Sequence, residues 1–162
     1  LGQSYSLFTP LQLANYVATL AGGGTRYNAH LLKEMRTYDS AELVDVYDEP
    51  PAEIIDIEPE NLQAVLQGMR DLVVSGSVAY YFKDCVVDAA AKTGTAQTGG
   101  KVSNGVFVAF APYDDPQIAL AVVIEKGGSG GALASTAVQI LNAYFTSVDE
   151  AKAVVGENML IQ

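Results

Sequence analysis

The chain has 162 residues, of which 49% are hydrophobic, so it can fill the core of one domain or of a large part of one. This proportion excludes an intrinsically disordered tail. The formal net charge of −10 leaves no basic surface for a phosphate backbone, so we expect no nucleic-acid partner.

A helix is predicted close to the start of the chain. Thr9 can cap it, Pro10 suits its first turn and Gln12 completes a capping box. Apolar residues then recur at helical spacing until three glycines, Gly22–Gly24, end the helix.

An acidic segment with short strands follows. Leu31–Tyr38 and Glu42–Tyr47 are predicted to form a hairpin through Asp39-Ser40, and Glu53–Ile57 can form another strand. Nine of the nineteen acidic residues fall within Asp39–Glu60, which contains no Lys or Arg. We interpret this segment as a solvated acidic face, with an acidic face that binds a partner as the alternative.

A second helix is predicted to open at Glu58 and to close at Ser75-Gly76, with acidic residues at the favourable end of its dipole. A short helical turn, Val78–Phe82, can follow it. The apolar stripe of the second helix consists of Leu62, Val65, Leu66, Met69, Leu72 and Val73.

The last third predicts three strands, Asp88–Gln97, Val106–Ala111 and Ile118–Ile124, followed by a helix over Ala132–Phe145. The nearly continuous apolar run of Ile118–Ile124 is typical of a strand near the middle of a sheet that is covered on both faces. Between the last strand and the last helix lies Gly127–Gly131. Its spacing does not match a dinucleotide-binding loop, so we interpret it as a flexible connector.

The chain has one cysteine and one histidine, Cys85 and His30. No internal disulfide can form, and the apolar neighbours of Cys85 indicate a buried, inert thiol. A Cys85–His30 nucleophile pair is the alternative, but nothing in the sequence places the two together. We expect neither a metal site nor a cofactor.

The sequence Lys92-Thr93-Gly94-Thr95 lies within the first of the three late strands. Strand alternation puts Lys92 and Gly94 on one face and both threonines on the other. An unpaired lysine is costly to bury, and a glycine in a strand often marks the close approach of a ligand. We therefore expect an exposed sheet edge beside a cleft, where ammonium, hydroxyl and backbone N–H groups can bind a carboxylate or an oxyanion. For an isolated motif, a lysine on a solvent-facing strand is the alternative.

Lys-Thr-Gly is one signature of penicillin-binding proteins and of class A β-lactamases. Over nearly its full length, this chain resembles the transpeptidase domain of class B penicillin-binding proteins. The segments that carry the resemblance follow the family's order: Gly2-Gln3 with Thr9–Ala14, Gly68-Met69 with Gly76–Phe82, Ala91–Gln97, Val106–Pro112, Ile118–Glu125 and Gly127–Gly131.

The resemblance implies an α+β fold in which helices flank an antiparallel sheet. It also implies a D,D-transpeptidase that cross-links peptidoglycan stem peptides through a serine acyl-enzyme and that binds β-lactams. Lys92 and Thr95 would take part in catalysis, through positive charge and an oxyanion-binding backbone N–H. Thr93 and Thr95 hydroxyls would bind the substrate carboxylate, Gly94 would leave room for the substrate backbone, and Gln97 would lie beside the site.

The sequence departs from the family pattern because it contains no Ser-x-x-Lys and no Ser-x-Asn. We therefore expect residues 1–162 to be the C-terminal part of a transpeptidase domain, inactive alone, with both motifs upstream. The alternatives are a non-catalytic scaffold of the same fold and a β-lactamase or β-lactam sensor.

The resemblance further implies a five-stranded sheet whose first two strands come from upstream sequence. Ile118–Ile124 would then have an unpaired apolar edge, so we expect the isolated chain to be oligomeric, swapped or rearranged. The expected partners are stem peptides, β-lactams and other cell-wall or division proteins. The expected location is the extracytoplasmic face of a bacterial membrane, with an anchor upstream of this chain. Gly2-Gln3 leans towards the elongation type of enzyme.

Overall fold

The computed structural model describes residues 7–158, so Gly2-Gln3 lies outside the described residues. The elements in chain order are α1 (Pro10–Ala21), β1 (Thr25–Arg26), β2 (Glu34–Arg36), β3 (Leu43–Val46), β4 (Glu53–Ile54), α2 (Pro59–Val74), α3 (Ala79–Phe82), β5 (Ala90–Ala96), β6 (Asn104–Ala111), β7 (Ile118–Ile124), the 3₁₀ turn η1 (Gly130–Leu133) and α4 (Ala134–Asn158).

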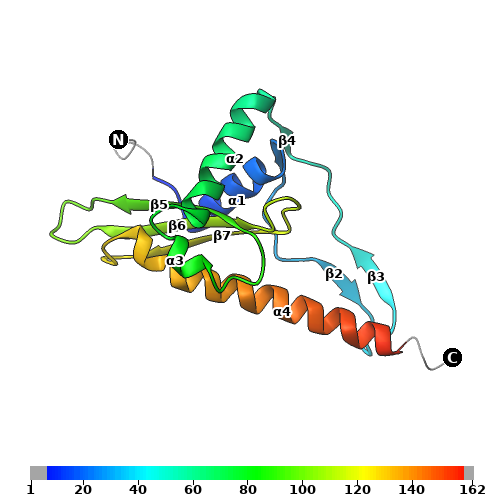
Figure 1. The fold of residues 1–162 in the computed structure, drawn as a ribbon. Helices are drawn as coiled ribbons and strands as arrows, with labels where there is room; N and C mark the ends of the chain where they lie inside the picture. The colour runs from blue at the N-terminus through cyan, green and yellow to red at the C-terminus, as the bar shows by residue number, and fades with distance from the viewer. Residues whose placement is uncertain (1–6, 159–162) are drawn as a thin grey trace.

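A three-stranded antiparallel sheet in the order β5-β6-β7 forms the centre of the described structure. Helices α1 and α2 pack on one face of this sheet, and η1 and α4 pack on the other (Figure 1). This arrangement confirms the predicted α+β class with an antiparallel sheet flanked by helices. The strands β5, β6 and β7 also fall where the sequence predicts strands.

Alternating side chains of the sheet fill two cores. Phe107 and Ala109 pack with Leu141 of α4, whereas Phe110 and Ala90 pack on the opposite face with α1 and α2. Complete burial of a side chain as large as Phe107 stabilises the fold by about 1.5–3 kcal/mol. The same alternation directs Lys92 and Gly94 to the α1–α2 face and directs Thr93 and Thr95 to the η1–α4 face.

The predicted cap of α1 is present in full. The Thr9 backbone N–H donates to Gln12 Oε1 over 2.9 Å, and the Gln12 backbone N–H donates to Thr9 Oγ1 over 3.2 Å. The helix ends before Gly22, and the buried Val17 anchors it to the sheet. Local sequence therefore fixes both ends of this helix.

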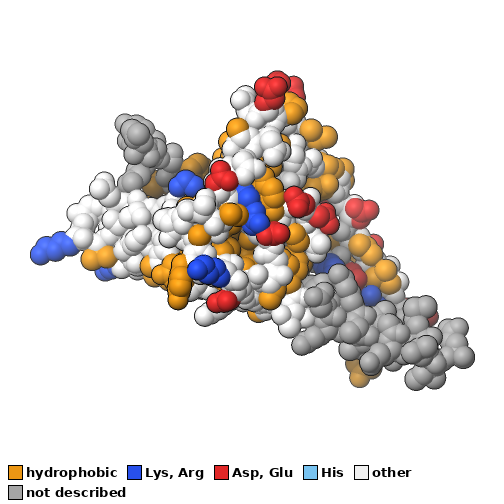
Figure 2. Space-filling view, viewed as in Figure 1, with side chains coloured by type: hydrophobic (Ala, Val, Ile, Leu, Met, Phe, Trp, Pro, Cys, Tyr) orange, Lys and Arg blue, Asp and Glu red, His pale blue; other side chains and the backbone are white. Residues whose placement is uncertain are grey.

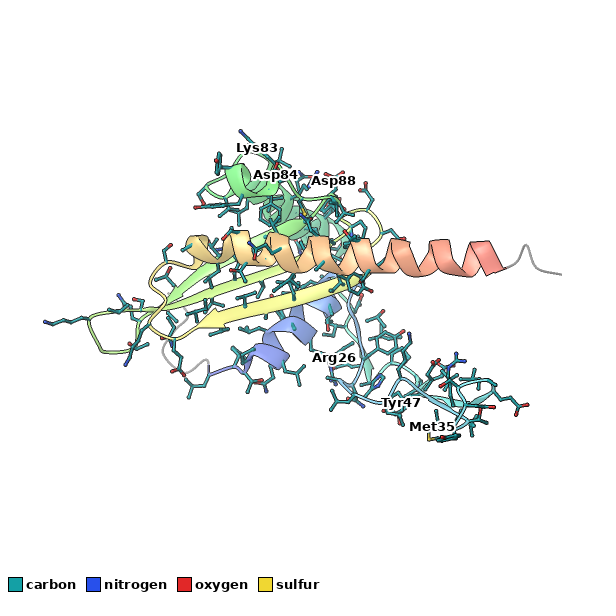
Figure 3. All side chains as sticks on the ribbon, turned by 90° about the horizontal axis from the view of Figure 1, so that it is seen from below. Arg26, Met35, Tyr47, Lys83, Asp84 and Asp88 are labelled. Carbon is teal, nitrogen blue, oxygen red and sulfur yellow. The ribbon has the colours of Figure 1, made fainter. Side chains whose placement is uncertain are left out.

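The acidic segment forms an arm made of β2 and β3, which pair in antiparallel fashion as the predicted hairpin requires. Both strands are shorter than predicted, and the β3 residues are exposed, so little burial supports a longer pairing. In Figure 3, Met35 and Tyr47 lie on this arm, away from the central sheet. The strand predicted at Glu53–Ile57 shortens to β4 and pairs with β1, which the sequence did not predict.

The remaining helices follow the prediction with two differences. The stripe of α2 buries Met69 and Val73, but Val65 is exposed. The last helix continues well beyond Phe145, to Asn158. The strand β7 is an outer strand of the described sheet, as expected for a chain that supplies three strands, although its apolar run is typical of a central strand. Within the described range, no helix combines the length and the apolar character needed to cross a membrane.

Candidate active site

The strand β5 runs from the core to the surface. Ala90 and Ala91 are fully buried, Lys92 and Thr95 are exposed, and Thr93 and Gly94 are half-buried. The two buried alanines hold the strand against the helices, so the four residues that follow project from a fixed base. All of the residues predicted to form the site lie on this strand or, in the case of Gln97, directly after it.

β5 is also an outer strand of the described sheet, with β6 as its neighbour. The prediction that Lys92–Thr95 lies at a sheet edge is therefore confirmed for the described residues. An outer strand can present backbone N–H and C=O groups to an extended ligand, in the way that a further strand would be bound.

The ammonium group of Lys92 stays at the surface. Its Nζ donates a hydrogen bond to the Thr93 carbonyl oxygen over 2.6 Å. An ammonium group has three donors, so this contact leaves capacity for an anionic ligand. The charge on Lys92 needs no buried counter-ion, because the side chain is exposed to solvent.

Thr95 is in contact with the glycine-rich segment after β7. The Gly130 backbone N–H donates to Thr95 Oγ1 over 3.3 Å. A threonine hydroxyl can both accept and donate hydrogen bonds. The geometry is compatible with the anion-binding role that the resemblance implies for Thr95.

Gly94 packs closely against the neighbouring strand. A Cβ atom at this position would lie 3.3 Å from Val106 Cβ, which is a tight contact. Packing inside the sheet therefore favours a small residue at position 94. The expected role, room for the substrate backbone, adds to this constraint and stays a prediction.

Few acidic residues lie near this end of the sheet, and Glu125, directly after β7, is one of them. On the face drawn in Figure 2, acidic side chains gather over α2 and beside β4, and the projecting β5–β6 turn shows none. Two lysines lie here, Lys92 on β5 and Lys101 on the turn between β5 and β6. With Lys126 next to Glu125, three lysines and one glutamate lie near this end of the sheet, so the local charge is positive although the chain is negative.

Arg70 of α2 is a residue that the sequence reasoning missed. Its Nη1 donates to the Ala89 carbonyl oxygen over 2.8 Å, and its Nη2 forms an ion pair with Asp88. The guanidinium carbon lies 5.7 Å from the centre of the Tyr113 ring. Arg70 therefore fixes the start of β5. The available signal was a single basic residue directly after the buried stripe residue Met69.

Cys85 and His30 lie in separate parts of the structure. The Cys85 side chain packs against the main core, and burial raises the pKa of its thiol. It is half-buried rather than fully buried as predicted. His30 lies beside the arm, where the centre of its ring is 3.8 Å from the centre of the Tyr47 ring, with the two rings tilted by 36°. Within residues 7–158, no group of three or more His, Cys, Asp or Glu side chains could hold a metal ion.

Two cavities of the described structure lie away from β5. Volumes of about 300 and 370 Å³ open between α1 and the segment around Tyr27. Neither is lined by Lys92, Thr93 or Thr95. The cleft expected beside β5 therefore stays a prediction.

The chain is similar to proteins of one family. The family model described as the penicillin binding protein transpeptidase domain matches residues 1–144. Penicillin-binding protein 2A of Bacillus subtilis is 36% identical over 134 residues, which are 74% of this chain and 19% of that protein. The peptidoglycan D,D-transpeptidase MrdA of Escherichia coli K12 is 31% identical over 161 residues, 88% of this chain and 25% of that protein. The chain thus spans about a quarter or less of the length of these relatives.

Solved structures give the same result. Penicillin-binding protein 2 of Pseudomonas aeruginosa, in complex with WCK 5153, matches 88% of this chain and 32% of its own with a TM-score of 0.74 and 33% identity. Penicillin-binding protein 2 of Helicobacter pylori, in complex with MreC, matches 90% of this chain and 26% of its own with a TM-score of 0.68 and 26% identity.

Proposed function

Because this chain belongs to the transpeptidase domains of class B penicillin-binding proteins, we propose that its full-length protein is a peptidoglycan D,D-transpeptidase. The observation that carries this proposal is the surface strand Lys92-Thr93-Gly94-Thr95, which emerges from a buried base at a sheet edge. The Escherichia coli relative MrdA, a peptidoglycan D,D-transpeptidase, supports the same activity.

In the proposed reaction, a serine hydroxyl attacks the carbonyl carbon of the D-Ala–D-Ala bond. The carbonyl oxygen takes up negative charge, then the amide bond breaks and D-alanine leaves with a proton. The amine of a second stem peptide attacks the acyl-enzyme and releases the serine. A β-lactam undergoes the same first step as the donor peptide. Its ring opens, and the product stays attached to the serine.

The residues of β5 take distinct roles in this reaction. The Thr95 backbone N–H donates to the oxyanion, which is the charge that develops in the transition state. The hydroxyls of Thr93 and Thr95 bind the terminal carboxylate of the donor peptide or of the β-lactam. Lys92 adds positive charge, Gly94 leaves room for the peptide backbone, and Gln97 lies at the rim of the site.

The nucleophile, its lysine base and the Ser-x-Asn motif are proposed to lie upstream of Leu1 in the full-length protein. Residues 1–162 contain neither Ser-x-x-Lys nor Ser-x-Asn, so this stretch alone supplies the substrate and oxyanion strand without the attacking group. We expect the 162-residue chain to be inactive by itself.

The proposed location is the extracytoplasmic face of a bacterial membrane, with an N-terminal anchor in the full-length protein. Peptidoglycan stem peptides are found there, and so are cell-wall proteins that could bind this enzyme. The similar protein from Helicobacter pylori forms a complex with MreC, which supports a cell-wall protein as a partner of the full-length protein.

Labelling of the full-length protein with a fluorescent penicillin tests the proposed function. We expect one stable covalent label per protein, blocked by benzylpenicillin and located on a serine of an upstream Ser-x-x-Lys motif. A folded protein that takes no label would instead indicate a non-catalytic scaffold. Rapid loss of the label with turnover would indicate a β-lactamase.

A further inference from the structure

Gly130, in the segment interpreted as a flexible connector, lies directly on the backbone of β5 and β6. A Cβ atom at this position would lie 2.8 Å from the Gly94 nitrogen and well inside contact distance of the Gly94 and Val106 carbonyl oxygens. These are backbone atoms, which cannot move aside as a flexible side chain can. A residue with any side chain at position 130 must therefore displace η1 or the strand that carries Gly94.

The next glycine has a different environment. A Cβ atom at Gly131 would meet Ser129 Oγ at 3.6 Å and Val78 Cγ1 at 3.9 Å, both ordinary contacts. Gly130 and Gly131 both begin η1, and neither has a positive φ that would itself require glycine. The requirement at position 130 is therefore steric and specific to that residue.

Several contacts hold the segment in this position. The Gly130 N–H donates to Thr95 Oγ1, and the Ser129 side chain accepts from the Gly131 N–H. The Gly128 N–H donates to the Ser103 carbonyl oxygen over 2.9 Å. Leu133, the last residue of η1, is buried in the core that contains Phe107 and Leu141. The segment is thus fastened between α4 and the end of β5.

The topology explains why these segments meet. β5 and β7 are both antiparallel to β6, so both end at the same end of the sheet (Figure 1). The chain leaves β7 there and begins η1 and α4 beside Thr95. The 3₁₀ turn η1, directly before α4, therefore abuts the part of β5 that carries the proposed oxyanion donor.

We propose that Gly130 is a positioning residue, which fixes the Gly94–Thr95 backbone so that the Thr95 N–H points at the oxyanion. This inference rests on the proposed function. It assigns the glycine-rich segment a role in the acylation step, acting through β5 and without contact with the substrate. Donors must lie 2.7–3.1 Å from the oxyanion, so a displacement of about 1 Å can cost about 100-fold in rate.

The test compares Gly130→Ala with Gly131→Ala in the full-length protein. Acylation by fluorescent penicillin gives two separate quantities, the rate constant and the final fraction of protein labelled. We expect Gly130→Ala to lower the rate constant by about 10- to 100-fold while the final fraction stays complete. Gly131→Ala should stay within about twofold of the unsubstituted protein, because its contacts are ordinary.

If Gly130 only supported folding, its replacement would change the final labelled fraction and not the acylation rate constant. If Gly130→Ala reduces the labelled fraction and leaves the rate constant unchanged, the proposal is wrong. If Gly130→Ala does not fold, Gly105→Ala carries the test, because its Cβ would press on Leu133 Cδ1 at 3.3 Å and on the Ser129 carbonyl oxygen at 3.4 Å. We expect a smaller slowing at full labelling; an unchanged rate constant would overturn the proposal.

Hydrogen exchange separates this inference from the proposed function. Gly130→Ala should speed amide exchange in the peptide that contains Gly94 and Thr95, and Gly131→Ala should not. Equal exchange in the two variants would overturn the positioning role even in a protein that penicillin labels. An unsubstituted protein that takes no label, yet shows this difference in exchange, would contradict the transpeptidase function and retain the positioning contact.

Discussion

The exposed Lys92 ammonium is the single charged group that β5 presents at the proposed site. We expect Lys92→Gln in the full-length protein to lower the acylation rate constant for penicillin by about 100-fold, because positive charge stabilises the developing oxyanion. Lys101→Gln, on the exposed β5–β6 turn, is the matched control and should change it little. Equal rate constants for both variants would remove Lys92 from the site.

The thiol of Cys85 provides a test of the core at the scale of one residue. Burial raises its pKa, so a smaller thiolate fraction is present at any given pH than for a free cysteine. Alkylation of Cys85 by iodoacetamide should therefore be slower at pH 8 than alkylation of free cysteine. It should also reach half its maximal rate at a higher pH than free cysteine does. Mass spectrometry of the Cys85 peptide measures this, and a midpoint at or below that of free cysteine would contradict the packing.

At the scale of elements, Arg70 connects α2 to the start of β5. Replacing it by Met keeps the apolar stem but leaves the Ala89 carbonyl oxygen without its charged donor. We expect Arg70→Met to lower the free energy of unfolding by about 2 kcal/mol in urea titrations. Asp88→Asn should cost less than about 1 kcal/mol, because that carboxylate is largely exposed. If both variants lose the same free energy of unfolding, the ion pair with Asp88, and not the hydrogen bond to Ala89, connects Arg70 to β5.

Elements with local signals could be predicted from the sequence, and contacts between distant segments could not. The capping box at Thr9 and Gln12 and the apolar runs of β6 and β7 are encoded within a few residues. The two-residue strand β1 has too few residues to show a periodicity, and it exists because β4 pairs with it.

The candidate site divides in the same way. The Lys92–Thr95 motif and its faces follow from strand alternation. The close packing of Gly130 against Gly94 joins residues that are 36 positions apart in the sequence. The hydrogen bond from Arg70 to the Ala89 carbonyl oxygen joins residues that are 19 positions apart. Tertiary packing decides both contacts, so composition and spacing predicted a flexible connector where the structure has a fastened segment.

At the scale of the whole molecule, β7 is an outer strand, and its last residue, Ile124, is 43% exposed. An apolar outer strand tends to pair with another chain. Light scattering of the 162-residue chain should therefore give a mass that rises with concentration, and Ile124→Lys should reduce the rise. A monomer mass at every concentration would contradict this prediction.

The most direct test of the central claim is a crystal structure of the full-length protein acylated by benzylpenicillin. We expect the acyl carbonyl oxygen to lie about 2.7–3.1 Å from the Thr95 backbone nitrogen. We also expect the penicillin carboxylate to accept a hydrogen bond from the Thr93 or the Thr95 hydroxyl. A penicillin bound with neither contact to β5 would contradict the account.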